Sequence, residues 1–347
     1  MITTPHPKPP GRTTRTGGWG GALRSPRVWG LGALSIAATG IGVALGWLAL
    51  REVAWGMAGD LLTSAGLALL VPALALYVAA GLVRGVRWQL LLEPERVGAR
   101  RLFLIEQSGT ALDTLSMVHL LDEVVETGIL TLRDRVPLGT VLSTLAAQRT
   151  MEFATTVALM AGGALFLPQL HPYWPYLTTG IVVALAAVVA LITLGPALHR
   201  VWLVGRLDLV RQFADGAGLI RTRWRRSLAA LAISVAQTLL LAVAGVLLGL
   251  GVDMHIGPAA LGVVTLGVFF FGATVPGLPL SIGTFEFAAV TLLGRWDVPA
   301  AQAVSFTVLL RGLTYLPPLL IGGVFLSREG LLSLGQLRAL TRQMRKG

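Results

Sequence analysis

The sequence contains no cysteine. This absence excludes disulfides, thiolate metal sites and cysteine nucleophiles. Charged residues are also scarce, at 13% of the 347 residues, whereas a soluble domain carries about 25%. Hydrophobic residues make up 54%, the mean hydropathy is +0.73, and several apolar runs exceed the roughly 18 residues that mark a membrane span. These features predict an all-α polytopic membrane protein.

Acidic residues are fewer than basic ones, which gives a formal net charge of +11. The basic residues gather in segments between apolar runs, a pattern that reflects membrane topology rather than nucleic-acid binding. The five histidines have no metal-ligand spacing, and no Ser-His-Asp pattern or nucleotide-binding loop is present. We therefore expect membrane lipids as partners, with no nucleic acid, no metal and no cofactor.

Six apolar segments are predicted to cross the membrane, and two further segments are predicted to enter and leave it on one side. The first hairpin, 102–135, is interrupted by polar residues, and the second, 258–297, contains the helix-breaking Pro276-Gly-Leu-Pro279. Eight membrane segments in another count remain an alternative. The predicted spans are 28–50, 61–83, 138–167, 177–198, 228–250 and 300–326. The flippase-like membrane domain covers 28–326, between a disordered basic tail at 1–27 and a basic tail at 327–347.

Loop charges predict the orientation, because basic loops remain on the cytoplasmic side. Both termini are expected in the cytoplasm, in a multi-pass protein of the plasma membrane. Residues 199–226 are expected to lie along the membrane interface, and Trp88 is expected to anchor there. The segments predicted to be cytoplasmic are 1–27, 84–101, 199–226 and 327–347. Those predicted to lie outside are 51–60, 168–176 and 251–257.

Two parts of the chain repeat the same pattern. Pro137 precedes Arg149 by 12 residues, and Pro299 precedes Arg311 by the same step, with a valine before each proline. The predicted topology reverses one copy relative to the other, so repeat one (about 61–167) and repeat two (about 228–326) are expected to form inverted repeats, as in alternating-access transporters. Chance similarity is the alternative.

Arg149 and Arg311 are predicted to lie near mid-depth, where an arginine is costly and therefore a candidate functional residue. Their forked donors suit an anionic head group such as a phosphate. Glu152 follows Arg149 by three residues, so a local ion pair that lowers the cost of insertion is the alternative. Arg311 has no acid within four residues, and we expect it to face the interior near Glu286 or a cavity.

Gly283 and Glu286 follow the predicted break in the second hairpin. Exposed backbone N–H groups there could bind an anion, while Glu286 could bind an amine, couple to a proton or only cap the helix. Glu123, with Asp122 and Glu126, occupies the matching place in the first copy, where these acids could instead be solvated. The predicted lipid head-group site is therefore Arg149, Arg311, Glu286, Gly283, Glu152 and Glu123.

Three stretches resemble the lysylphosphatidylglycerol synthase transmembrane-region family, which has a flippase-like membrane domain. They are Arg84-Gly-Val-Arg87-Trp88, Gln148-Arg149-Thr-Met-Glu152 and Pro279-Leu-Ser-Ile-Gly283-Thr-Phe-Glu286. The sequence departs from the family pattern in the first copy, where Asp122 and Glu126 stand at a glycine and an arginine position. Gln148 and Glu152 likewise stand where the family has glutamate and aspartate.

The resemblance implies a lipid translocase for an anionic, aminoacylated or polyprenyl-linked lipid, without the soluble aminoacyl-transfer domain of two-part members. A membrane-embedded enzyme or an accessory subunit acting on a lipid phosphate is the alternative, and an inactive scaffold is a third reading. An enzyme would need a base or nucleophile, for which only Glu286, Glu123 and Asp113 are candidates, so an enzyme is less expected. A homo-oligomer and a separate lipid-modifying enzyme are the other partners that the sequence leaves open.

Overall fold

The computed structural model describes residues 67–114, 121–197, 208–275 and 281–329, with the single residues Trp47, Gly56 and Asp60. Every regular element in these ranges is a helix, which confirms the predicted all-α class. The tail 1–27, the tail after 329, the first span apart from Trp47 and the break at 276–279 lie outside the described residues.

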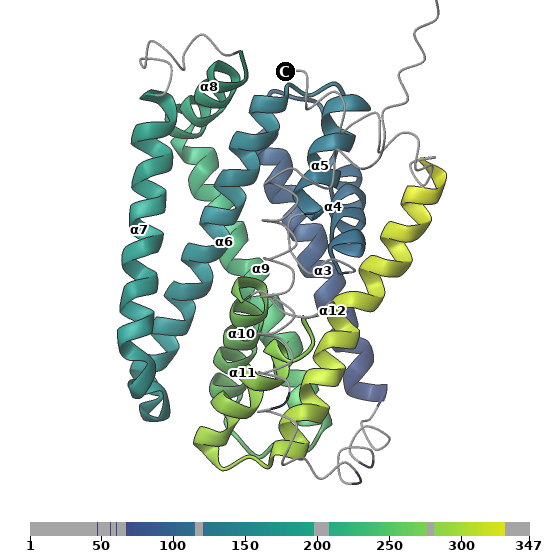
Figure 1. Ribbon diagram of the computed structural model, residues 1–347, viewed down its shortest axis with the longest axis vertical. Helices are drawn as coiled ribbons and strands as arrows, with labels where there is room; N and C mark the ends of the chain where they lie inside the picture. The colour runs from purple at the N-terminus through teal and green to yellow at the C-terminus, as the bar shows by residue number, and fades with distance from the viewer. Residues whose placement is uncertain are drawn as a thin grey trace, which may run out of the picture. The chain divides into compact units, whose positions relative to one another are not determined.

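Five long helices and five shorter ones make up the described part of the chain (Figure 1). The long helices are α3 (Leu67–Leu92), α6 (Leu138–Phe166), α7 (Trp174–Ala197), α9 (Trp224–Gly251) and α12 (Ala300–Arg328). The shorter ones are α4 (Ala99–Asp113), α5 (Leu121–Leu132), α8 (Asp208–Thr222), α10 (Pro258–Thr274) and α11 (Thr284–Leu293). Two 3-10 turns, Pro168–Tyr173 and Gly294–Trp296, precede α7 and follow α11.

Four described helices are long and apolar enough to cross a membrane, which supports a multi-pass membrane protein. They correspond to the predicted spans 61–83, 177–198, 228–250 and 300–326. Helix α6 has 29 residues, as many as α12, but Arg149 and Glu152 lower its hydropathy. Helices α4, α5 and α11, with 15, 12 and 10 residues, are shorter than the roughly 20 residues that a span needs. The hairpin interpretation therefore fits their lengths.

The predicted basic loop 84–101 is wrong over its first half, because α3 continues to Leu92. The guanidinium groups of Arg84 and Arg87 find partners inside the protein, so the helix has no need to end where the charges begin. The predicted interface anchor Trp88 is also wrong, since its ring is buried and its Nε1–H donates to Thr144 Oγ1 at 3.3 Å.

The two repeated Val-Pro pairs both lie at the start of a long helix. Pro137 and Pro299 are the N-cap residues of α6 and α12, with extended backbone at φ −56° and −57°. Two residues earlier, Arg135 and Asp297 both adopt left-handed conformations, at φ 58° and 56°. The chain thus turns in the same way before each long helix, and the fixed φ of proline suits the entry to that helix.

The helices of the two predicted repeats run in opposite directions. Leu69, at the start of α3, lies beside Gly251 at the end of α9. At the other end of these two helices, Glu93, which follows α3, forms an ion pair with Arg226 in the first turn of α9, at 2.8 Å. Helix α12 begins near the end of α9, where Gln302 Nε2 donates to the Val252 carbonyl at 3.1 Å. It ends near the start of α4, since Glu329 pairs with Arg101 at 3.0 Å.

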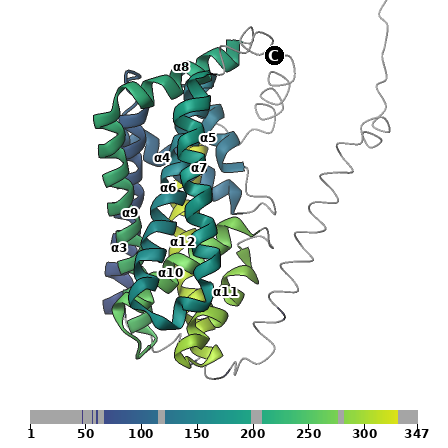
Figure 2. The ribbon, with the colours of Figure 1, turned by 90° about the vertical axis from the view of Figure 1, so that its left-hand side faces the viewer.

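The packing partners are exchanged between the halves. The hairpin helix α4 packs on α12, and its counterpart α10 packs on α6, while α3 and α9 pack on each other. The hairpins α4–α5 and α10–α11 lie toward opposite ends of the long helices in both views (Figures 1 and 2). These directions and partners are those that inverted repeats require, and superposition of the two halves stays a prediction.

Glycines permit close approach where the halves meet. A Cβ added at Gly322 of α12 would meet the backbone of Gln107 and Ser108 on α4. A Cβ added at Gly163 of α6 would meet the Val263 side chain on α10. Each long helix therefore reaches the hairpin of the other half at a position without a side chain.

Candidate functional site

The second half contains a buried ion pair between its hairpin and its last long helix. Arg311 Nη2 pairs with Glu286 Oε1 and approaches the Ser281 carbonyl oxygen at 3.4 Å. The Arg311 side chain is 16% exposed, and its guanidinium lies 5.9 Å from the centre of the Phe285 ring. Its Nε is buried without a hydrogen-bond partner among the described residues. Arg311 therefore faces the interior beside Glu286, and part of its donor capacity is unused.

Glu286 serves both as a helix cap and as an ion-pair partner. Its Oε2 accepts a hydrogen bond from the Gly283 N–H at 2.8 Å, while Oε1 faces Arg311. This is half of a capping box, because Gly283 has no side chain to supply the reciprocal bond. Gly283 has φ 91°, a conformation that favours glycine, so the backbone turns here to present its N–H to the carboxylate. The two roles expected from the sequence thus coexist on different oxygens.

The first half surrounds its equivalent arginine with several acids. Arg149 pairs with Asp122 of α5, with Glu123 at 3.5 Å and with Glu152 on its own helix at 3.7 Å. Its side chain is 39% exposed, more than twice the exposure of Arg311. The structure therefore brings the predicted residues Arg149, Glu123 and Glu152 together, and it adds Asp122 as a partner of Arg149.

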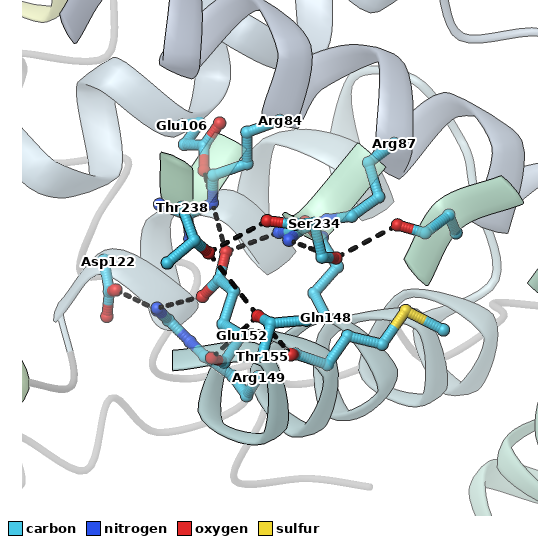
Figure 3. A network of polar contacts seen from close by, with 12 residues as sticks. Arg84, Arg87, Glu106, Asp122, Gln148, Arg149, Glu152, Thr155, Ser234 and Thr238 are labelled. Carbon is cyan, nitrogen blue, oxygen red and sulfur yellow. Dashed lines mark hydrogen bonds and ion pairs between the residues drawn. The ribbon is translucent and has the colours of Figure 1, made fainter. Parts of the chain in front are cut away.

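Glu152 connects this group to α3 (Figure 3). Arg84 Nε lies 2.8 Å from Glu152 Oε1, and Arg87 contacts the same oxygen. The fully buried Arg87 also donates to Gln148 Oε1 and to Ser234 Oγ of α9, each at 3.0 Å. The local pair between Glu152 and Arg149 is therefore only one branch of a network that joins α3, α6 and α9.

Three members of this network were missed by sequence reasoning. Arg84 and Arg87 were assigned to a cytoplasmic loop, and Glu106 was noted only as an interruption of an apolar segment. Arg84 pairs with both Glu106 and Glu152. The apolar run Leu90–Leu92 after Trp88 and Gln89 is the sequence signal that α3 continues past the arginines.

The solvated reading of the acidic turn is wrong for one of its three acids. Glu126 is 2% exposed, whereas the Glu123 side chain is 43% exposed. The Asp122 side chain has an intermediate exposure of 16%. Helix α5 turns Glu126 toward α4, where its Cγ lies close to Gly109. A short amphipathic helix gives its acids different environments, and a loop would not.

Tyrosines lie between the two groups. Pro318 has no N–H, so the Thr314 carbonyl lacks its helical donor and instead accepts a hydrogen bond from the Tyr77 hydroxyl at 2.9 Å. Tyr315 donates to Ser281 Oγ at 3.0 Å beside Arg311. In the part of the chain that the structure describes, the ion pairs around Arg149 and Arg311 share no member. The sequence expectation that both arginines belong to one lipid head-group site therefore remains a prediction.

The three acids that could serve an enzyme as base or nucleophile all have ion-pair or hydrogen-bond partners. Glu286 uses both oxygens, Glu123 faces Arg149, and Asp113 accepts a hydrogen bond from the Leu121 N–H at 3.2 Å. A cavity of about 350 Å³ lies away from both ion-pair groups, beside the turns that follow α3 and α5. Its lining includes Arg96, Arg101 and Asp134. No group of acids and histidines in the described ranges has the arrangement of a metal site.

The chain has a match among known protein families. Residues 33–322 match the family described as lysylphosphatidylglycerol synthase TM region. The chain belongs to this family. No curated protein and no solved structure matches the chain. The part that matches the lysylphosphatidylglycerol synthase TM region contains both predicted repeats up to Gly322 and every charged residue of the two groups described above.

Proposed function

We propose that the protein is a translocase that moves a lipid with an anionic head group between the leaflets of the plasma membrane. The observation that carries the proposal is the equivalent position of Arg149 and Arg311, each on a long helix and each paired with an acid of the neighbouring hairpin. Membership of the lysylphosphatidylglycerol synthase TM-region family supports a lipid-related role in a membrane.

The chemistry of an arginine inside an apolar helix favours a phosphate as its ligand. A guanidinium donates two parallel hydrogen bonds to an oxyanion, and these bonds are stronger away from water. Arg149 is partly exposed, and Arg311 has a buried Nε without a described partner. A phosphate that replaces a carboxylate on either arginine would preserve the charge balance of that pair. Such exchange keeps the arginine compensated, and the displaced acid must then be hydrated or bind a proton.

The two arginines would act on opposite faces of the membrane. Their hairpins lie toward opposite ends of the long helices (Figure 1), and inverted repeats commonly present alternate access to the two sides. We propose that the α4–α5 hairpin meets lipid from the cytoplasmic leaflet and that the α10–α11 hairpin meets lipid from the outer leaflet. An aminoacylated or polyprenyl-linked lipid also carries the phosphate on which this recognition rests.

The translocase proposal is tested by measuring leaflet sidedness with the purified full-length protein in liposomes. Labelled phosphatidylglycerol, an aminoacylated phosphatidylglycerol, a polyprenyl phosphate and phosphatidylcholine form the panel. We expect phosphatidylglycerol, its aminoacylated form and the polyprenyl phosphate to change leaflet faster than in protein-free liposomes. Arg311→Lys should slow this movement because it keeps the charge and loses the fork. Normal movement by a folded Arg311→Gln variant would remove Arg311 from the mechanism.

The orientation is tested separately with single introduced cysteines, since the native chain has none. An impermeant thiol reagent applied to intact cells should label a cysteine in 168–176 or 251–257, but not one in 208–222. Labelling in 208–222 without labelling in 168–176 would reverse the proposed orientation.

A further inference from the structure

Carboxylates outnumber guanidinium groups around Arg149. The guanidinium groups are Arg84, Arg87 and Arg149, and the carboxyl groups are Glu106, Asp122, Glu123, Glu126 and Glu152. Glu123 is the most exposed of these acids, so water can solvate its charge. The other four compete for three arginines, and two of them, Glu106 and Glu126, are buried, where an uncompensated charge is costly.

Glu126 is the acid with the least direct compensation. It is 2% exposed, and the described residues include no ion-pair or hydrogen-bond partner for its carboxyl group. The charged groups that interact electrostatically with it lie on α3, α4, α5 and α6. Arg149 of α6 and Arg84 of α3 are the positive ones, and Glu106 of α4 and Asp122 of α5 are the negative ones. The ionised form of Glu126 therefore depends on positive charge that it does not contact directly.

Glu106 is a second buried acid whose carboxyl group is incompletely compensated. One of its oxygens pairs with Arg84, whereas Oε2 is buried and has no hydrogen-bond partner among the described residues. A buried oxygen without a donor is destabilising as part of a carboxylate and is less so when the group is neutral. The geometry therefore contains two buried carboxyl groups, on adjacent helices, to which a proton can bind.

We propose that this cluster binds one proton together with each anionic lipid, with Glu126 as the proton-binding residue and Glu106 beside it. The inference rests on the proposed lipid translocation. A phosphate that binds Arg149 neutralises the positive charge facing Glu126, so the Glu126 carboxylate takes a proton from water and becomes a neutral carboxylic acid. One negative charge arrives with the lipid and one positive charge arrives with the proton, so the occupied site has the same net charge as the empty one.

The proposal makes the transported unit electrically neutral. A singly charged lipid that moves with one proton transfers no net charge, so the membrane potential should not drive it. A pH gradient should drive it. At equilibrium, a gradient of one pH unit supports about a tenfold ratio of lipid between the leaflets, because one unit corresponds to about 1.36 kcal/mol.

The experiment uses the full-length protein in liposomes with labelled phosphatidylglycerol, with a pH gradient, a potassium diffusion potential or a sodium gradient imposed in turn. The wild type should accumulate lipid in one leaflet under the pH gradient alone. Glu126→Gln should still move lipid but should equilibrate it to a leaflet ratio near one. Asp215→Asn, which changes an exposed acid of α8 outside the cluster, should respond to the pH gradient as the wild type does.

A second measurement does not need the Glu126→Gln variant and therefore tests the proposal even if that variant fails to fold. Addition of phosphatidylglycerol to the wild type in weakly buffered detergent should cause uptake of about one proton per bound lipid, and Glu106→Gln should alter that number. Lipid movement that ignores the pH gradient, follows the sodium gradient or takes up no proton would overturn the coupling and leave the translocase intact. Absence of lipid movement under every condition would overturn the translocase itself.

Discussion

The two halves of the molecule hold an arginine at the same step after a proline but surround it differently. Arg311 has one acid, Glu286, and the pair is almost closed to solvent. Arg149 has three acids within 4 Å, and one of them is shared with two further arginines. A repeated sequence pattern thus fixes where the charge lies in the helix, and the residues that are not repeated decide how that charge is balanced.

The difference predicts which half tolerates change. In a single buried pair, loss of one partner leaves the other uncompensated. In a branched network, a remaining partner can take over, and exposed members can be hydrated. Substitution of an ion-pair residue should therefore lower the stability of the protein mainly when it lies in the second half. In the first half, such a substitution should mainly reduce lipid movement.

The largest effect is expected from Glu286→Gln. The amide can still accept the Gly283 N–H bond, so the substitution removes the charge while the helix cap is kept. Among the described residues, Arg311 then retains the Ser281 carbonyl and the Phe285 ring, and loss of one partner of a buried pair costs about 3–5 kcal/mol. Unfolding in mixed micelles measures this loss.

The double variant Glu286→Gln, Arg311→Gln is the control for Glu286→Gln. It should recover most of the stability, because neither charge is left alone, but it should not move lipid. If the double variant is as unstable as the single one, the cost lies in packing and not in the unpaired charge.

The next effect is expected from Gly322→Ala. The new methyl group would meet backbone atoms of α4, which cannot rotate away, so we expect a loss of about 2 kcal/mol from overpacking. Gly163→Ala in the other half should cost less, since it meets the Val263 side chain, which can change rotamer. Gly323→Ala, where nothing lies within 4 Å, should be neutral or slightly stabilising, because alanine favours a helix. Equal melting temperatures for all three would show that the helices do not approach as closely as described.

A smaller effect on stability is expected from Arg149→Gln. Asp122 and Glu123 are partly exposed and can be hydrated, and Glu152 keeps Arg84 and Arg87. We expect a cost of about 1 kcal/mol, as for exposed ion pairs, together with a strong loss of lipid movement. A destabilisation as large as that of Glu286→Gln would contradict the proposed difference between the halves.

The smallest effect is expected from Glu123→Gln. The side chain is exposed and lies 3.5 Å from Arg149, so the free energy of unfolding should change by less than about 0.5 kcal/mol. Asp122→Asn should cost more, because it is the less exposed partner. The reverse order would make Glu123 the principal partner of Arg149.

Apolar length and proline placement predicted the helices well. Helix α6 was expected at 138–167 and runs from Leu138 to Phe166, because the proline that precedes it fixes its start and polar residues are absent from its last turns. The part of the predicted second hairpin that follows its break is α11, whose first turn contains the glutamate that caps it. The start of a helix and its cap depend on residues that are close in the sequence, so they can be predicted from the sequence alone.

The charge network could not be predicted in the same way. Rules for loop charges treat each arginine as solvated, yet Arg84 and Arg87 are paired by Glu106 and Glu152, which are distant in sequence. Likewise, spacing alone favoured Glu123 over Asp122, although the orientation of α5 decides which acid faces Arg149. Tertiary pairing determined both outcomes, and one sequence does not reveal it.

The polar middle of α6 also bears on how the protein is made. Helix α6 is not among the apolar helices that could cross a membrane by composition, because Arg149 and Glu152 lie within it. A charged residue at the centre of a nascent helix opposes its release from the translocon into lipid. Helix α3 is synthesised earlier and carries Arg84 and Arg87, the partners of Glu152. The order of synthesis therefore places the arginines in the membrane first, and α6 is expected to leave the translocon only by docking on them.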